Sequence, residues 1–233
     1  MKRILVISLL ATGACAHGPV PVADAELAAL TGKSLEPVEA ARKEEGTTRQ
    51  AIEARRLELN AALREIRIAD AAARRDEADF EVARLRLEGA QETKDADAML
   101  PAKDRRAKAE RALAASQAEV PYRQAARAYA EARLREAEAT HDVAMAQLER
   151  AKAVAVIGDG TPLPSQIERR AGFDALVANA QAKLADATIK VARTKGDLQL
   201  AEVQWKNTVG GAPPAPAAPA AGAPATPAST SKP

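Results

Sequence analysis

The chain has 233 residues, of which 47% are apolar but only 2% are aromatic. Alanine supplies most of the apolar share; it has the highest helix propensity but buries little area, whereas aromatic residues normally fill a thick core. The formal net charge is +2, with basic and acidic residues interspersed. This composition favours long, closely packed helices, and it excludes a deep-cored globule and the basic surface that nucleic-acid binding requires.

Residues 1–14 are typical of an export signal. Lys2 and Arg3 give a positive start, Ile4–Leu10 an apolar stretch, and Ala11–Ala14 a run of small residues. The apolar stretch is much shorter than the ~20 residues that span a bilayer. We therefore predict a signal peptide and not a transmembrane anchor.

Cys15, the one cysteine of the chain, follows this signal directly. The run Ala11–Cys15 resembles the lipobox of bacterial lipoproteins, in which the cysteine is acylated and becomes the new N-terminus. The resemblance implies lipidation of Cys15, and Ala16 in place of an aspartate implies sorting to the outer membrane. Cleavage after Ala16 also fits the small-x-small rule and would release a soluble periplasmic protein, so both outcomes stay open.

Residues 15–34 are expected to form a flexible, lipidated leader, because they contain Gly18, Pro19, Pro21 and Gly32. Turn-forming residues at this density favour a tether over a packed element.

A helical body is predicted for residues 35–208. Its first helix begins around residues 36–37, since proline is tolerated in a first turn. Thr47 and Gln50 have the spacing of a capping box after Gly46, so we expect a short helix that leads into a long one.

Apolar residues then recur every seven positions, and a second, mostly alanine set lies three positions after them. The first set is Ile52, Leu59, Ile66, Ala73, Phe80 and Leu87, and the second is Arg55, Ala62, Ala69, Asp76, Ala83 and Ala90. The heptad indicates a coiled-coil-like seam of large and small residues. Pro101 removes a backbone donor, so the first hairpin turn is predicted there.

A second helix is predicted over residues 102–157, with a kink or short break at Pro121. Its seam pairs small residues with mostly larger ones: Ala130, Ala137, Ala144 and Ala151, with Leu134, His141, Leu148 and Ala155. Residues 158–164, rich in Gly and Pro, are predicted to form a loop.

A third helix is predicted to open at Ser165 and Glu168, which have capping-box spacing, and to end near Thr208. Its seam has a large residue at every seventh position and a small one three further on: Val177, Leu184, Val191, Leu198 and Trp205, with Ala180, Ala187, Thr194 and Ala201. The expected fold is all-α, either an elongated antiparallel helical hairpin or a three-helix coiled-coil-like bundle.

Residues 209–233 consist almost wholly of Pro, Ala, Gly, Ser and Thr. They are predicted to form a disordered tail with polyproline II character. The tail either contacts the cell wall or has no binding role.

No catalytic, cofactor-binding or metal-binding residue is predicted. His17 and His141 are the two histidines, and there is no second cysteine to complete a metal site. His141 falls on a seam, where a packing role is expected and a pH-sensitive packing site is the alternative. The carboxylates follow the helices without the fixed separation that acid–base catalysis needs.

Three aromatic residues are candidate partner contacts. Trp205 extends the third seam, so a core position is expected first and a partner anchor second. Tyr122 and Tyr129 lie one heptad apart and can mark a docking face.

These features predict a non-catalytic cell-envelope lipoprotein with a structural or scaffolding role on the periplasmic side of the outer membrane. Its lipid contacts the membrane, and its helix faces can bind a protein partner or a second copy. One alternative is a helical adaptor or binding subunit of an envelope transport or secretion complex. Another is a soluble, chaperone-like periplasmic protein if Cys15 is not lipidated.

Overall fold

The computed structural model describes residues 19–28, 30, 32–158 and 163–210. The predicted signal peptide, Cys15 and the Pro/Ala-rich tail from residue 211 onward lie outside these residues. The described chain is all-α, as predicted, with no strand among its elements.

Three long helices follow two short elements. The elements are α1 (Asp24–Ala28), the 3-10 helix η1 (Gly32–Ser34), α2 (Glu36–Glu92), α3 (Ala96–Ile157) and α4 (Pro164–Val209). None of the described helices combines the length and apolar composition that crossing a bilayer requires.

The chain divides into two compact units. Unit 1 contains the described residues up to Asn60 together with Ala130–Arg193, and unit 2 contains Ala61–Tyr129 together with the described residues from Thr194 onward. The long helices contribute to both units, and we describe each unit by itself.

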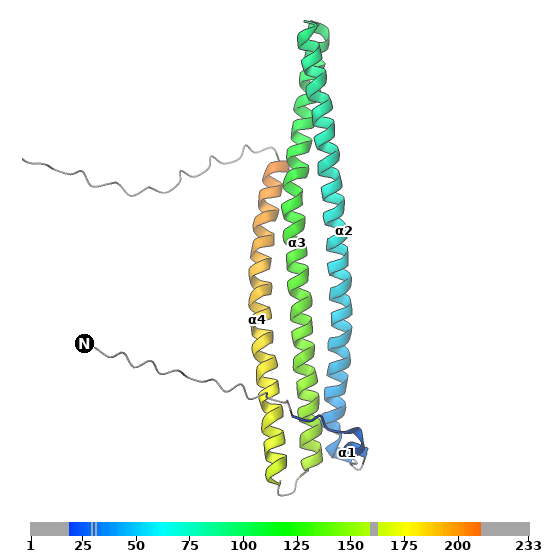
Figure 1. The fold of residues 1–233 in the computed structure, drawn as a ribbon, viewed down its shortest axis with the longest axis vertical. Helices are drawn as coiled ribbons and strands as arrows, with labels where there is room; N and C mark the ends of the chain where they lie inside the picture. The colour runs from blue at the N-terminus through cyan, green and yellow to red at the C-terminus, as the bar shows by residue number, and fades with distance from the viewer. Residues whose placement is uncertain (1–18, 29, 31, 159–162, 211–233) are drawn as a thin grey trace, which may run out of the picture. The chain divides into compact units, whose positions relative to one another are not determined.

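In unit 1, α2, α3 and α4 lie side by side (Figure 1). Glu58 of α2 pairs with Arg133 of α3 at 3.2 Å, while Val38, twenty residues earlier, packs against Leu148. Because α3 numbers rise as α2 numbers fall, the two helices are antiparallel. On the other side of α3, Thr188 donates a hydrogen bond to Glu136 and Phe173 packs on Ala153, so α4 is antiparallel to α3 as well.

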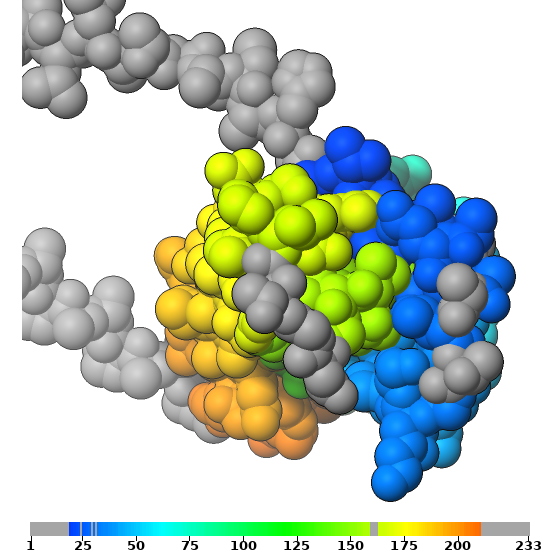
Figure 2. Space-filling view, turned by 90° about the horizontal axis from the view of Figure 1, so that it is seen from below, coloured from blue at the N-terminus to red at the C-terminus, as the bar shows by residue number. Residues whose placement is uncertain are grey.

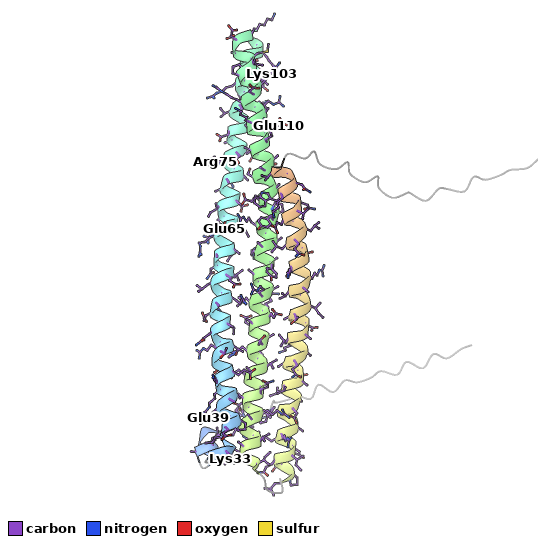
Figure 3. All side chains as sticks on the ribbon, turned by 180° about the vertical axis from the view of Figure 1, so that it is seen from behind. Lys33, Glu39, Glu65, Arg75, Lys103 and Glu110 are labelled. Atoms are coloured by element: carbon purple, nitrogen blue, oxygen red, sulfur yellow. The ribbon has the colours of Figure 1, made fainter. Side chains whose placement is uncertain are left out.

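In unit 2, α2 and α3 form an antiparallel pair. Leu87 and Ala90 pack on Ala102, and Arg123 of α3 approaches Glu65 of α2 at 3.6 Å. Figure 3 labels Glu65 on α2. The last part of α4 adds a third helix through Trp205, which lies against Tyr122.

The predicted seams are confirmed by burial. Every seam residue named above for the three helices is buried or half-buried. The seam of α3 is joined by a second heptad row that was not predicted, and its members Ala132, Ala139 and Ala153 are buried. This row faces α4 at Ala153, which packs against Phe173. One helix with two small-residue rows can therefore pack on two neighbours.

The first hairpin turn lies at Thr93–Asp95, so the prediction of a turn at Pro101 is wrong. Lys94 adopts a left-handed backbone conformation with φ 53°, and Asp95 Oδ1 accepts hydrogen bonds from the amides of Asp97 and Ala98, both at 3.1 Å. Asp95 thus caps α3 at its start. Pro101 falls early in α3, and Pro121 also lies inside this continuous helix, without the predicted break.

Helix α2 runs without interruption through Gly46, so the expected short first helix is not present. The Thr47 hydroxyl donates to the carbonyl of Lys43, one turn earlier, and therefore does not cap a new helix. The start near residues 36–37 is confirmed by the bounds of α2.

Helix α4 begins one residue earlier than predicted, at Pro164. The Leu163 amide donates to Gln166 Oε1 at 2.9 Å, and the Gln166 amide donates to the Leu163 carbonyl. Leu163 is therefore the N-cap residue and Pro164 the first helical residue, where a missing N–H costs nothing. Ser165 is already inside the helix, which ends at Val209.

Candidate functional site

Tyr122 and Trp205, two of the predicted partner contacts, meet in unit 2. Their rings stack with centroids 5.0 Å apart and planes 6° from parallel. The Arg123 guanidinium lies over the Tyr122 ring, 5.3 Å from its centroid, and Arg123 also bonds Glu119. Both aromatic side chains are half-buried. Their stacking holds the last turns of α4 against α3, while part of each side chain faces solvent.

Lys206 follows Trp205 and bonds Glu202, one turn earlier on α4, at 2.6 Å. This hydrogen bond, together with the charge of Glu202, raises the pKa of Lys206 above its ordinary value. The ammonium stays charged next to the aromatic pair at physiological pH.

Tyr129, the third predicted contact, is half-buried and is not part of the stack. Heptad spacing alone grouped Tyr122 with Tyr129, whereas the packing of α3 against α4 joins Tyr122 to Trp205. The main role of the Tyr122–Trp205 pair is therefore to join α3 to α4, and part of the pair stays exposed to solvent.

We predict that Tyr122→Ala uncovers Trp205. The unfolding free energy should fall by about 1 kcal/mol more than the loss of buried apolar area alone would cause, as expected for an aromatic pair. Because Trp205 is the one tryptophan of the chain, its fluorescence reports on this contact alone. Emission should shift to longer wavelength, and acrylamide quenching should increase. Tyr129→Ala is the matched control; an equal shift in that variant would contradict the assignment.

His141 faces α2 in unit 1. Its Nδ1 lies 3.1 Å from Thr48 Oγ1, and its Nε2 lies 3.9 Å from a carboxylate oxygen of Glu45. Because the Thr48 hydroxyl donates its one proton to the Glu45 carbonyl, it accepts at His141, which therefore carries a proton on Nδ1. The contact with Thr48 ties α3 to α2 at the seam on which the sequence places His141.

The start of unit 1 holds a contact that the sequence did not indicate. Arg169 of α4 donates to the carbonyl of Pro21 at 3.0 Å and to that of Val20 at 3.2 Å, and it reaches the Glu26 carboxylate at 3.4 Å. The Val22 amide donates to Glu149 Oε2 of α3. These bonds fix the N-terminal segment onto both helices.

Apolar packing supports the same contact. Val22 and Leu27 are buried in a cluster with Ala153 and Phe173, and Phe173 is only 1% exposed. The part of the predicted flexible leader that the structure describes is therefore folded. The missed signal was the set of apolar residues between its turn formers, Val22, Leu27 and Leu30.

A shallow groove of about 620 Å³ lies between this segment and the first turns of α4. Its lining includes Pro19, Val20, Glu26, Ser165, Glu168 and Arg169. Within the described part of the chain, no group of three or more His, Cys, Asp or Glu side chains is placed to hold a metal ion.

Comparison of the chain with protein-family models, with characterised proteins and with solved structures gives no match. The functional argument therefore rests on the residues themselves.

Proposed function

We propose that this chain is an exported lipoprotein, anchored through Cys15, whose helical body has a non-catalytic scaffolding role on the periplasmic side of the outer membrane. The observation that carries the proposal is the order of the first fifteen residues: two cations, an apolar stretch, four small residues and the chain's one cysteine. A cysteine inside the helical body would not follow an export signal, so its position would not support lipidation.

The chemistry of anchoring uses the Cys15 thiol as a nucleophile. Its sulfur forms a thioether with the diacylglyceryl group of a phospholipid as the glyceryl C–O bond to the phosphate breaks, and the thiol proton leaves with the phosphate head group. Hydrolysis of the Ala14–Cys15 peptide bond then frees the new amino terminus. Two or more acyl chains give stable anchoring, whereas a single chain gives only marginal binding.

The body supports a scaffolding role through its exposed helix faces. Ion pairs within one helix cover much of these faces, as Arg84 does with Glu81 and Glu88, and such pairs add about 0.3 kcal/mol each. Between the charges lie exposed apolar side chains, among them Leu57, Ile68 and Ile189. Long faces of this kind offer binding area to a protein partner or to a second copy.

Metabolic labelling with a fatty-acid analogue tests the proposal. The wild-type chain should incorporate the label and sediment with membranes, and density separation should place it with outer membranes. Cys15→Ser should lose the label. An unlabelled, soluble wild-type protein that begins at His17 would overturn the proposal in favour of a soluble periplasmic protein.

In-cell cross-linking separates a scaffold from an adaptor. A photoreactive residue at Tyr129, which leaves the Tyr122–Trp205 stack intact, should capture cell-wall material, a structural envelope protein or a second copy. Specific capture of a channel or pump component would instead favour the adaptor alternative.

A further inference from the structure

Residues 19–28 pack against one end of unit 1, where α2 and α4 begin and α3 ends, and we call these contacts the lock. We call this end the base; Figure 2 views it from below. Besides the bonds from Arg169 and the buried Val22, Pro19 packs directly on Gly172 of α4. A Cβ added at Gly172 would lie 3.2 Å from the Pro19 Cβ and 3.3 Å from its Cγ.

This lock sets the length of any tether from Cys15. Pro19 is four residues after Cys15, and four fully extended residues span at most about 14 Å. An acyl group on Cys15 therefore inserts into a bilayer within that distance of Pro19. A bilayer that takes up the anchor must lie next to the base.

The base presents apolar side chains suited to such a surface. Val20 is 75% exposed, Leu163 is 62% exposed and Ile167 is 54% exposed. Leu163 and Ile167 belong to the N-cap and first turn of α4, and helical side chains tilt toward the N-terminus of their helix. Ile167 therefore leans toward the start of α4, where Leu163 lies.

The base also carries exposed charges of both signs. Lys33, labelled near the start of α2 in Figure 3, and Arg170 are exposed, and so are Glu36 and Glu168. A mixed set of charges of this kind gives little net attraction to anionic lipid. Contact with the bilayer then depends on the short anchor, which raises the local concentration of membrane, and on the apolar side chains.

We infer that the base of unit 1, through Val20, Leu163 and Ile167, lies directly against the bilayer that holds the Cys15 anchor. The long helices of unit 1 then extend away from the membrane surface, with the base held at that surface. This inference rests on the proposed lipidation and adds the docking surface and the orientation of unit 1.

Spin labels on the intact, lipidated protein test the inference. Acylation blocks the sulfur of Cys15, so a new cysteine is the one free thiol to label. Ile167→Cys places a nitroxide at the base, and Ile189→Cys, 22 residues later on α4, places a control about 33 Å farther along the same helix. Both proteins are reconstituted in vesicles of phosphatidylethanolamine and phosphatidylglycerol.

At position 167 we expect collisions with lipid-soluble oxygen to exceed those with an aqueous nickel complex, and at position 189 the reverse. The ratio at position 167 should persist in 0.5 M salt. If the nickel complex reaches both positions equally while the protein remains acylated, the inference is wrong and the lipoprotein proposal stands. If Cys15 carries no lipid, the proposed function itself fails.

Gly172→Ala tests the part played by the lock. The added methyl group requires Pro19 to shift by a few tenths of an ångström, which weakens its packing on α4 and should reduce the protection of the label at position 167, with acylation unchanged. Gly196→Ala is the control, because no atom lies within 4 Å of its added Cβ. Full protection in the Gly172→Ala protein would show that the lock does not place the base.

Discussion

Phe173→Ala should lower the free energy of unfolding by about 3–5 kcal/mol, the range for removal of a buried phenylalanine. The side chain is 1% exposed and is the largest fully buried one among the described residues, in a chain with only two phenylalanines. Its loss leaves a cavity among Val22 and Leu27 of the N-terminal segment and Ala153 of α3. Urea unfolding followed by circular dichroism measures the change.

Phe80→Ala is the matched control for this prediction. Phe80 is only half-buried on the seam of α2, so less apolar area is lost and the destabilisation should be clearly smaller. A second measurement distinguishes a local effect from a global one: the Val22 amide, which bonds Glu149, should exchange its hydrogen faster in Phe173→Ala. Equal costs for the two variants would contradict the packing described for the base.

The seams of the three long helices could be predicted because they depend on local sequence alone. A large residue every seventh position, as from Val177 to Trp205, defines one helix face whatever its neighbour is. The same rule could not reveal the second row on α3. Ala132 and Ala139 are buried, whereas Ala175 and Ala182 of α4 are exposed, and alanine is common at both kinds of position because it favours helices everywhere.

The turns were harder to predict because two signals competed. Pro101 is a strong helix breaker, but α3 tolerates it as its sixth residue, just past the first turn, at the cost of one backbone hydrogen bond. The cap by Asp95 and the left-handed conformation of Lys94 decide the position of the turn instead. The polar side chain at residue 95 was the available signal, and it was outweighed by the proline.

The contacts of the candidate sites depend on registers between helices, which no local pattern contains. Tyr122 and Trp205 are 83 residues apart in sequence, and their stacking requires the antiparallel alignment of α3 with α4. Similarly, Arg169 binds carbonyls almost 150 residues earlier. Only the apolar residues between Pro21 and Gly32 could have suggested that it packs.

Ala144→Leu should destabilise the protein by about 1–3 kcal/mol, the usual cost of overpacking a tight interior. Ala144 is 2% exposed and lies on the α3 seam between His141 and Leu148. Leucine adds three carbon atoms where no space is left, so it must leave its preferred rotamer or move a helix backbone. Because leucine is nearly as good a helix former as alanine, the loss would come from packing and not from helix propensity.

Ala182→Leu separates these two contributions, because Ala182 is exposed on α4 in the same unit. Its unfolding free energy should stay within about 0.5 kcal/mol of the wild-type value. If Ala144→Leu were equally neutral, the helices would have room for larger side chains at this seam. The alanine content would then reflect helix propensity alone, and close contact between α3 and its neighbours would no longer explain why this chain contains so few large residues.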